Sequence, residues 1–112
     1  MFHLDIPVAN FTISDNAKRG IEKLRQAFNE KSTDPAAVLM IGWGRAMPNS
    51  GSSSENVVVG FYGQSEVPKI ADALQDVSGL KIFFFATPKD YPNFAGKVLD
   101  FNDHRGFFLR IP

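Results

Sequence analysis

The chain has 112 residues, with 12 Lys and Arg against 12 Asp and Glu, and it contains no cysteine. This length is typical of one domain that buries about two-thirds of the surface exposed by the unfolded chain. Without cysteine, disulfides, thiolate metal sites and a cysteine nucleophile are excluded. A formal net charge of zero provides no broad field for phosphate backbones or anionic lipids, so nucleic-acid and membrane partners are disfavoured.

The first residues do not have the pattern of a targeting segment. Residues 1–7 lack the basic region and the continuous apolar core of a secretion signal. No apolar run approaches the roughly 20 residues that cross a bilayer. We therefore expect a single domain over residues 1–112, located in the cytoplasm.

A helix is predicted to begin directly after Ser14. The Ser14 hydroxyl can accept a backbone N–H of the first turn. Gly20 lies inside the predicted helix, where it costs about 1 kcal/mol relative to alanine, so we expect it to pack closely against a neighbouring element. Pro35 forces the preceding residue out of helical geometry, and the helix should end before it. Its apolar stripe, at positions i, i+4, i+7 and i+11, consists of Ala17, Ile21, Leu24 and Phe28.

The next segments predict a hairpin with a long loop, followed by a second helix. Residues 36–43 and 57–62 are apolar or β-branched runs typical of paired strands. The stretch Gly44 to Asn56 is rich in glycine and serine, and we expect a mobile loop there. Ser65 can cap a helix that keeps helical spacing to Val77 and ends at Ser78-Gly79.

The remaining third predicts strands at residues 80–86, 97–101 and 107–111, with a turn or a single helical turn at 87–93. Three consecutive phenylalanines favour a central position for the first of these strands. Two helices and about five short strands without regular βαβ alternation predict an α+β fold with one mixed or mostly antiparallel sheet.

Several of these segments resemble one known family. Residues 79–85 (Gly-Leu-Lys-Ile-Phe-Phe-Phe), 94–101 (Phe-Ala-Gly-Lys-Val-Leu-Asp-Phe) and 106–109 (Gly-Phe-Phe-Leu) are similar to the strand, Leu-x-Gly-x-x-Ile-Asp-Tyr and Gly-Phe patterns of the HesB/IscA-like A-type iron–sulfur carriers. Residues 11–17 resemble the first strand and the Thr-x-x-Ala helix start of that family. The resemblance implies a HesB/IscA-like domain.

The cluster ligands of that family do not carry over to this chain. Where the family has a Gly-Gly-Cys-Ser-Gly turn, this chain has residues 42–45 (Gly-Trp-Gly-Arg) and the Gly/Ser loop, and no Cys-Gly-Cys motif follows the last strand. We therefore expect a non-catalytic binding or interaction module, related to iron–sulfur biogenesis only by fold and without a cofactor. One alternative is a metal or iron carrier that uses oxygen and imidazole ligands or the thiols of a partner.

Two groups of residues are candidates for ligand or partner binding. Trp43 lies beside the predicted loop, where a ligand could stack on it, and Arg45 could recognise an anion; core packing of Trp43 is the favoured interpretation. The turn Asp103-His104-Arg105 is the second group. If both groups surround one pocket, a small-molecule enzyme is a further alternative, although no catalytic residue is predicted. Asp100, Asp103 and His104 could also offer ligands to a metal, but a solvated turn is favoured and no metal site is predicted.

The 11 phenylalanines exceed what one sheet face needs. Side chains alternate along a strand, so Phe83 and Phe85 lie opposite to Phe84, and Phe107 lies opposite to Phe108. If helices cover only one face, the other face needs a cover of its own. We expect a homodimer or another protein partner, with Phe83, Phe85 and Phe108 at the interface; the alternative is a monomer with a two-sided core.

Overall fold

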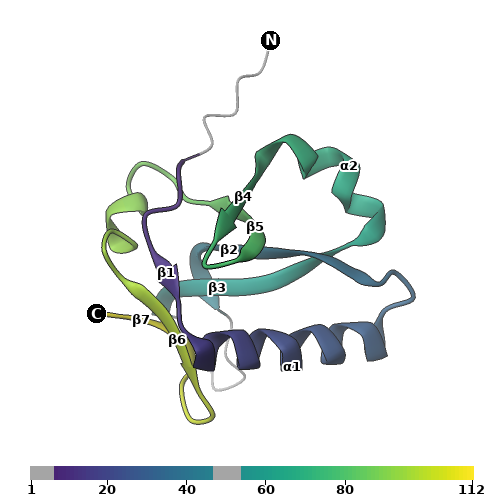
Figure 1. Cartoon of the computed structure of the whole chain (residues 1–112), viewed down its shortest axis with the longest axis horizontal. Helices are drawn as coiled ribbons and strands as arrows, with labels where there is room; N and C mark the ends of the chain where they lie inside the picture. Colours follow the sequence, from purple (N-terminus) through teal and green to yellow (C-terminus); the bar gives the residue numbers. More distant parts are fainter. Residues whose placement is uncertain (1–6, 47–53) are drawn as a thin grey trace.

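The computed structural model describes residues 7–46 and 54–112. It contains two β-sheets, whereas the sequence predicts a single sheet of about five strands. The α+β class is confirmed, and the described residues contain seven strands and two α-helices (Figure 1). In chain order these are β1 (Thr12–Ile13), α1 (Asp15–Lys31), β2 (Ala36–Ala46), β3 (Ser54–Gly63), α2 (Val67–Ile70), β4 (Leu74–Val77), β5 (Leu80–Phe85), β6 (Val98–Asn102) and β7 (Gly106–Arg110).

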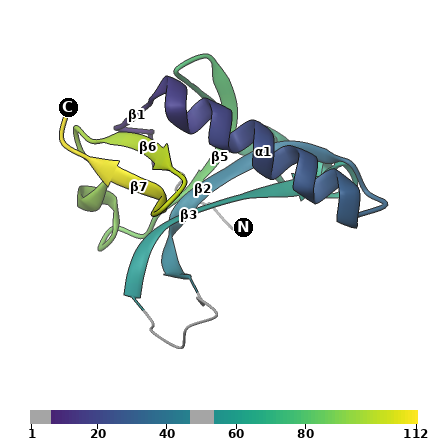
Figure 2. The ribbon, with the colours of Figure 1, turned by 90° about the horizontal axis from the view of Figure 1, so that it is seen from below.

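Both sheets are mixed. The four-stranded sheet has the order β3-β2-β5-β4, with β2 parallel to β5 and both outer pairs antiparallel. The three-stranded sheet has the order β1-β6-β7, with β1 parallel to β6 and β6 antiparallel to β7. Figure 2 shows α1 lying across β2 and β3, with the three-stranded sheet beside one end of the helix. The predicted hairpins β2–β3 and β6–β7 and the interior position of β5 are confirmed.

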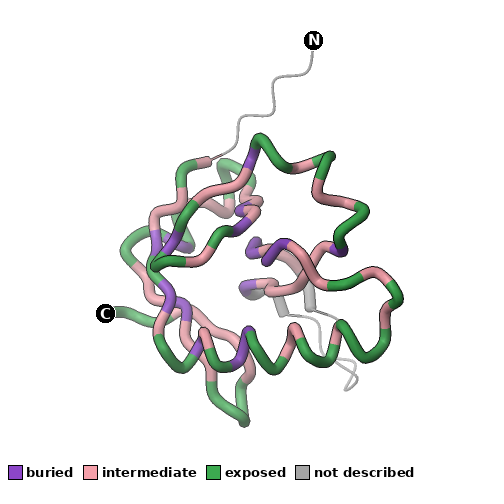
Figure 3. The backbone as a smooth tube through the Cα atoms, turned by 45° about the vertical axis from the view of Figure 1, so that its right-hand side comes forward, coloured by how far each residue is buried: buried purple, intermediate pink, exposed green. Residues whose placement is uncertain are grey.

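The first helix begins and ends where the sequence predicts. Ser14 is its N-cap, and the Ser14 hydroxyl accepts a hydrogen bond from the Ala17 N–H at 3.0 Å. The helix ends at Lys31, before the Asp34-Pro35 pair. Ala17, Gly20 and Ile21 are buried, whereas the opposite side of the helix is exposed (Figure 3).

Gly20 packs directly against β6, which confirms the predicted close contact with a neighbouring element. A Cβ atom at Gly20 would lie 2.6 Å from Cγ of Phe101. We expect Gly20→Ala to lower the free energy of unfolding by about 1–2 kcal/mol, because overpacking outweighs the higher helix propensity of alanine. Urea unfolding measures this, with the exposed Gln26→Ala on the same helix as the control. A Gly20→Ala protein as stable as wild type would contradict the close contact.

The predicted second helix is mostly absent. Only Val67–Ile70 is α-helical, with single 3₁₀ turns at Gln64–Glu66 and Ala71–Ala73, and Leu74–Val77 forms strand β4. Ser78 and Gly79 have φ of 51° and 85°, and they form the two-residue turn between β4 and β5. Two positive φ values in succession are typical of a type I′ hairpin turn, so these residues do not form the predicted helix C-cap.

The predicted loop from Gly44 to Asn56 is also shorter than expected. Strand β2 continues to Ala46 and β3 begins at Ser54, so Gly44 pairs with Asn56 and Ala46 pairs with Ser54. The rest of the predicted loop, residues 47–53, lies outside the described residues. The long β2–β3 hairpin extends away from α1 in Figure 2.

The core lies between α1 and the inner faces of the two sheets. Phe84 and Phe94 are its largest fully buried side chains, and their rings meet edge-on with centroids 4.9 Å apart. Phe11 packs against both rings. No helix in the described ranges, 7–46 and 54–112, is long and apolar enough to cross a membrane. The remaining fully buried large side chains are Ile21, Ile41, Ile82 and Leu99.

Candidate functional site

Trp43 lies on β2 and points toward the core. Its ring is edge-on to Phe94, with centroids 6.0 Å apart, and it packs against the buried cluster. The indole Nε1 is buried and has no hydrogen-bond partner in the described part of the chain. The backbone of Arg45 lies opposite that of Glu55 in the β2–β3 register, but the Arg45 side chain lies outside the described residues. Core packing, the favoured interpretation of Trp43, fits this placement, and a ligand role for either residue stays a prediction.

The predicted turn residues lie at the tip of the β6–β7 hairpin. Oδ1 of Asn102 accepts hydrogen bonds from the backbone N–H groups of His104 and Arg105, so this side chain closes the turn. The Asp103 carboxylate lies 3.6 Å from Nζ of Lys23 on α1. The Arg105 guanidinium carbon lies 4.2 Å from the centroid of the Phe108 ring. The side chains of Asp103 and Arg105 thus face different neighbours.

Trp43 and the turn Asp103-His104-Arg105 belong to different sheets. Trp43 belongs to the four-stranded sheet and packs inward, whereas the turn follows β6 of the three-stranded sheet and faces α1. Neither of the two clefts described below includes Trp43 or His104. The Arg45 side chain lies outside the described residues, so the enzyme alternative built on Trp43, Arg45 and His104 stays a prediction.

The possible metal ligands at this turn are also dispersed. Asp103 faces Lys23, and Asp100 is bonded to Ser14 and Arg110. Within residues 7–46 and 54–112, no three His, Asp or Glu side chains are grouped closely enough to hold a metal ion. The carrier alternative with oxygen and imidazole ligands stays a prediction.

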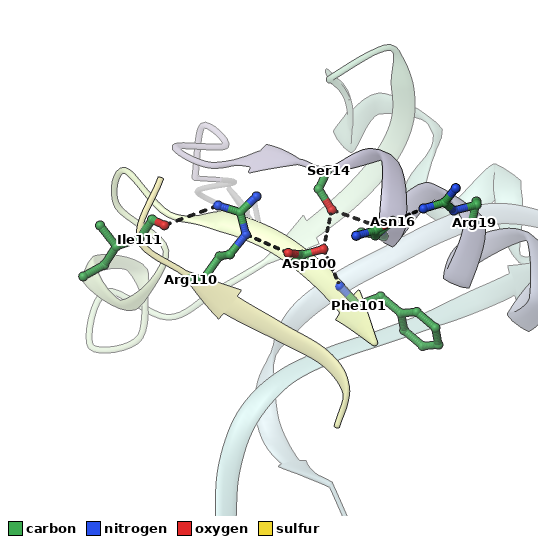
Figure 4. A network of polar contacts seen from close by, with 8 residues as sticks. Ser14, Asn16, Arg19, Asp100, Phe101, Arg110 and Ile111 are labelled. Atoms are coloured by element: carbon green, nitrogen blue, oxygen red, sulfur yellow. Dashed lines mark hydrogen bonds and ion pairs between the residues drawn. The ribbon is translucent and has the colours of Figure 1, made fainter. Parts of the chain in front are cut away.

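Asp100 is the centre of a polar network that joins α1 to the three-stranded sheet (Figure 4). Its Oδ1 accepts hydrogen bonds from the Ser14 hydroxyl at 2.7 Å and from the Phe101 N–H at 2.9 Å, and its Oδ2 accepts one from Nε of Arg110 at 2.7 Å. The hydrogen bonds from Ser14 and Arg110 lower the pKa of Asp100. Because Ser14 also caps α1, this network fixes the helix start against β6 and β7.

The structure divides the predicted interface between the two sheets. Phe83 and Phe85 lie on β5 of the four-stranded sheet, whereas Phe108 lies on β7 of the three-stranded sheet. Phe83 and Phe85 are half-buried and stack on each other with centroids 6.2 Å apart, and Tyr62 meets Phe83 edge-on. Strand register places these rings on the side of the sheet away from Phe84 and α1, here called the outer face. By register, the outer face includes Val38, Met40, Gly42, Val58, Gly60, Tyr62, Leu74, Phe83 and Phe85, together with the charged pair Asp76 and Lys81.

A shallow cleft of about 380 Å³ separates α1 from the β6–β7 turn, here called the helix–turn cleft. It brings Asp103, a predicted binding residue, together with helix residues that are not among the predicted binding residues. The signal was present in their spacing, because positions i, i+3, i+4 and i+7 share one side of a helix. The turn that faces this side follows far later in the chain. The lining residues are Asn16, Arg19, Gly20, Lys23, Phe101, Asn102 and Asp103.

A second open cleft, of about 350 Å³, lies beside β1 and the C-terminus. It is lined by residues 9–12, residues 96–98 and Pro112. Oδ1 of Asn10 is buried and unpartnered among the described residues, while its Nδ2 donates to the Tyr91 carbonyl at 3.4 Å. Since solvent does not reach this Oδ1 atom, it offers no accessible acceptor to a ligand.

No protein-family model matches the chain, and no curated protein matches it significantly. The HesB/IscA-like resemblance therefore stays a prediction.

Proposed function

We propose that this protein is a non-catalytic interaction module that associates with a second copy of itself through the outer face. The observation that carries the proposal is the apolar composition of that face. In sheets with antiparallel strands, the face opposite the core is commonly polar. Here that position holds the half-buried rings of Tyr62, Phe83 and Phe85 beside Met40 and other apolar residues. A contiguous apolar face of this kind is typical of an interaction site.

Two positions of the outer face are glycines, and neighbouring side chains lie over them. A Cβ atom at Gly42 would lie 2.1 Å from the Phe85 ring, so this ring lies down across β2. A Cβ atom at Gly60 would lie 3.1 Å from Cε of Met40, which covers that position in the same way. Sheets pack face to face at a separation of about 10 Å. Side chains that lie down over the glycine positions leave room for a second sheet at this separation.

The charges around the outer face favour a second copy as the partner. Asp76 on β4 and Lys81 on β5 are cross-strand neighbours, both exposed, on the same side as Phe83. In a two-fold symmetric interface the same residues meet from both sides, so a face that bears one acid and one base complements itself. The formal net charge of zero adds no overall repulsion between two copies.

Sedimentation equilibrium from low to high micromolar concentration tests this proposal with two matched variants. We expect wild type to be a dimer and Phe83→Thr to be a monomer, since threonine keeps strand propensity but removes the ring. Phe108→Thr makes the same change in the three-stranded sheet and should remain a dimer. Circular dichroism confirms that both variants are folded. A monomeric wild type, or dissociation by Phe108→Thr and not by Phe83→Thr, would overturn the proposal.

A further inference from the structure

The helix–turn cleft is formed by the close contact between Gly20 and Phe101. Because Gly20 has no side chain, the Phe101 ring lies directly on α1 and forms an apolar floor. Asn16, Arg19 and Lys23 stand on the same side of the helix and surround this floor with polar groups. The cleft volume of about 380 Å³ is within the range of small-molecule sites.

Positive charge exceeds negative charge in this cleft. Arg19 and Lys23 are its cations, and Asp103 is the acid that lines it. The Lys23–Asp103 pair is 3.6 Å long, and its side chains are 69% and 82% exposed, so the interaction is weak and exchangeable. Arg19 donates to Oδ1 of Asn16 and has no carboxylate partner within the described residues. Its guanidinium therefore retains donors for an external anion.

The amides of the cleft add hydrogen-bond donors. Oδ1 of Asn102 is occupied by the backbone N–H groups of His104 and Arg105. Oδ1 of Asn16 is occupied by Arg19. The Nδ2 groups of both amides have no partner among the described residues, and they can only donate. Arginine, lysine and two amide donors above a phenylalanine ring form a set suited to an oxyanion attached to a small apolar body.

We propose that the helix–turn cleft binds a small organic oxyanion, a carboxylate or a phosphate, with Arg19 and Lys23 holding the charged group and Phe101 contacting the apolar body. In the free protein the Asp103 carboxylate pairs with the Lys23 ammonium group, and the ligand takes the place of this carboxylate. This site is separate from the outer face and does not depend on dimer formation.

Two-dimensional ¹H–¹⁵N NMR titrations test the site with inorganic phosphate and with benzoate, at ionic strength matched by sodium chloride. We expect at least one probe to produce saturable shifts at the amides of Gly20, Phe101 and Asn102. Saturation by benzoate supports a carboxylate ligand, and saturation by phosphate supports a phosphate ligand. Failure of both probes to saturate would overturn the proposal.

Variants of equal charge separate a specific site from general attraction. Arg19→Gln with Lys23→Gln should weaken binding by roughly tenfold or more, since hydrogen bonds to charged groups are lost. Lys18→Gln with Lys31→Gln removes the same charge from α1 outside the cleft and should leave the affinity unchanged. Asp103→Asn should strengthen binding, because the competing carboxylate is gone. Equal weakening in both double variants would contradict a defined site.

Discussion

Replacement of Phe94 by alanine is expected to lower the free energy of unfolding by about 4 kcal/mol, a typical loss for the truncation of a fully buried aromatic side chain. Phe94 is 0% exposed, and its ring contacts three others. The centroid of Phe94 lies 4.9 Å from that of Phe84, 5.2 Å from Phe11 and 6.0 Å from Trp43. These partners belong to β5, the N-terminal segment and β2, so the cavity would be lined from several directions and could not easily collapse.

Urea unfolding at one low protein concentration measures this effect without a contribution from association. The control is Phe108→Ala, which removes the same atoms from a half-buried ring whose cation–π partner is Arg105. We expect the control to lose about 1 kcal/mol. Similar losses for the two variants would contradict the central position of Phe94 in the core.

Elements defined by neighbouring residues could be predicted from the sequence. The cap at Ser14, the end of α1 before Pro35 and the hairpin β6–β7 depend on contacts within a few residues. The interior position of β5 was also predictable, because Phe83-Phe84-Phe85 is apolar on both sides of the strand.

Elements defined by distant pairing could not be predicted in the same way. Residues 74–77 fit helical spacing, but pairing with β5 makes them strand β4. The division into two sheets depends on the parallel pairing of Thr12 with Val98 and Ile13 with Leu99, which no local pattern specifies. Tertiary pairing overrides local preference at both places.

The candidate sites show the same limit. The hairpin tip with Asp103 was predicted, but its position opposite Lys23 follows from the packing of Gly20 on Phe101. The alternation of Phe83 and Phe85 was likewise visible in the sequence, whereas the placement of Phe108 in another sheet was not. Spacing identifies residues that share one side of an element, and the fold decides which other element that side meets.

Replacement of Asp100 by alanine is expected to cost about 2–3 kcal/mol, because it removes an acceptor of charge-assisted hydrogen bonds that joins three elements. The Asp100 side chain is 13% exposed, so the Ser14 hydroxyl would lose a partner in a largely desolvated place. Ser14→Ala should lower the free energy of unfolding by about 1 kcal/mol, the usual value of an N-cap. It should lose somewhat more in addition, because the hydrogen bond from Ser14 to Asp100 is also removed. If the network acts as a unit, the double variant will lose less than the sum of the two single losses.

The charge on Asp100 also makes stability depend on pH in a defined direction. Hydrogen bonds from Ser14 and Arg110 lower the pKa of Asp100 in the folded protein, whereas in the unfolded chain this carboxyl has its ordinary pKa of about 4. The folded state therefore binds this proton less readily, and its contribution is present above about pH 4 and lost as pH falls through the lowered pKa. We expect Asp100→Asn to flatten the acid limb of stability measured by urea unfolding. The exposed Asp72→Asn should keep the slope of wild type, and parallel curves for all three proteins would show that the network contributes no charge-dependent stability.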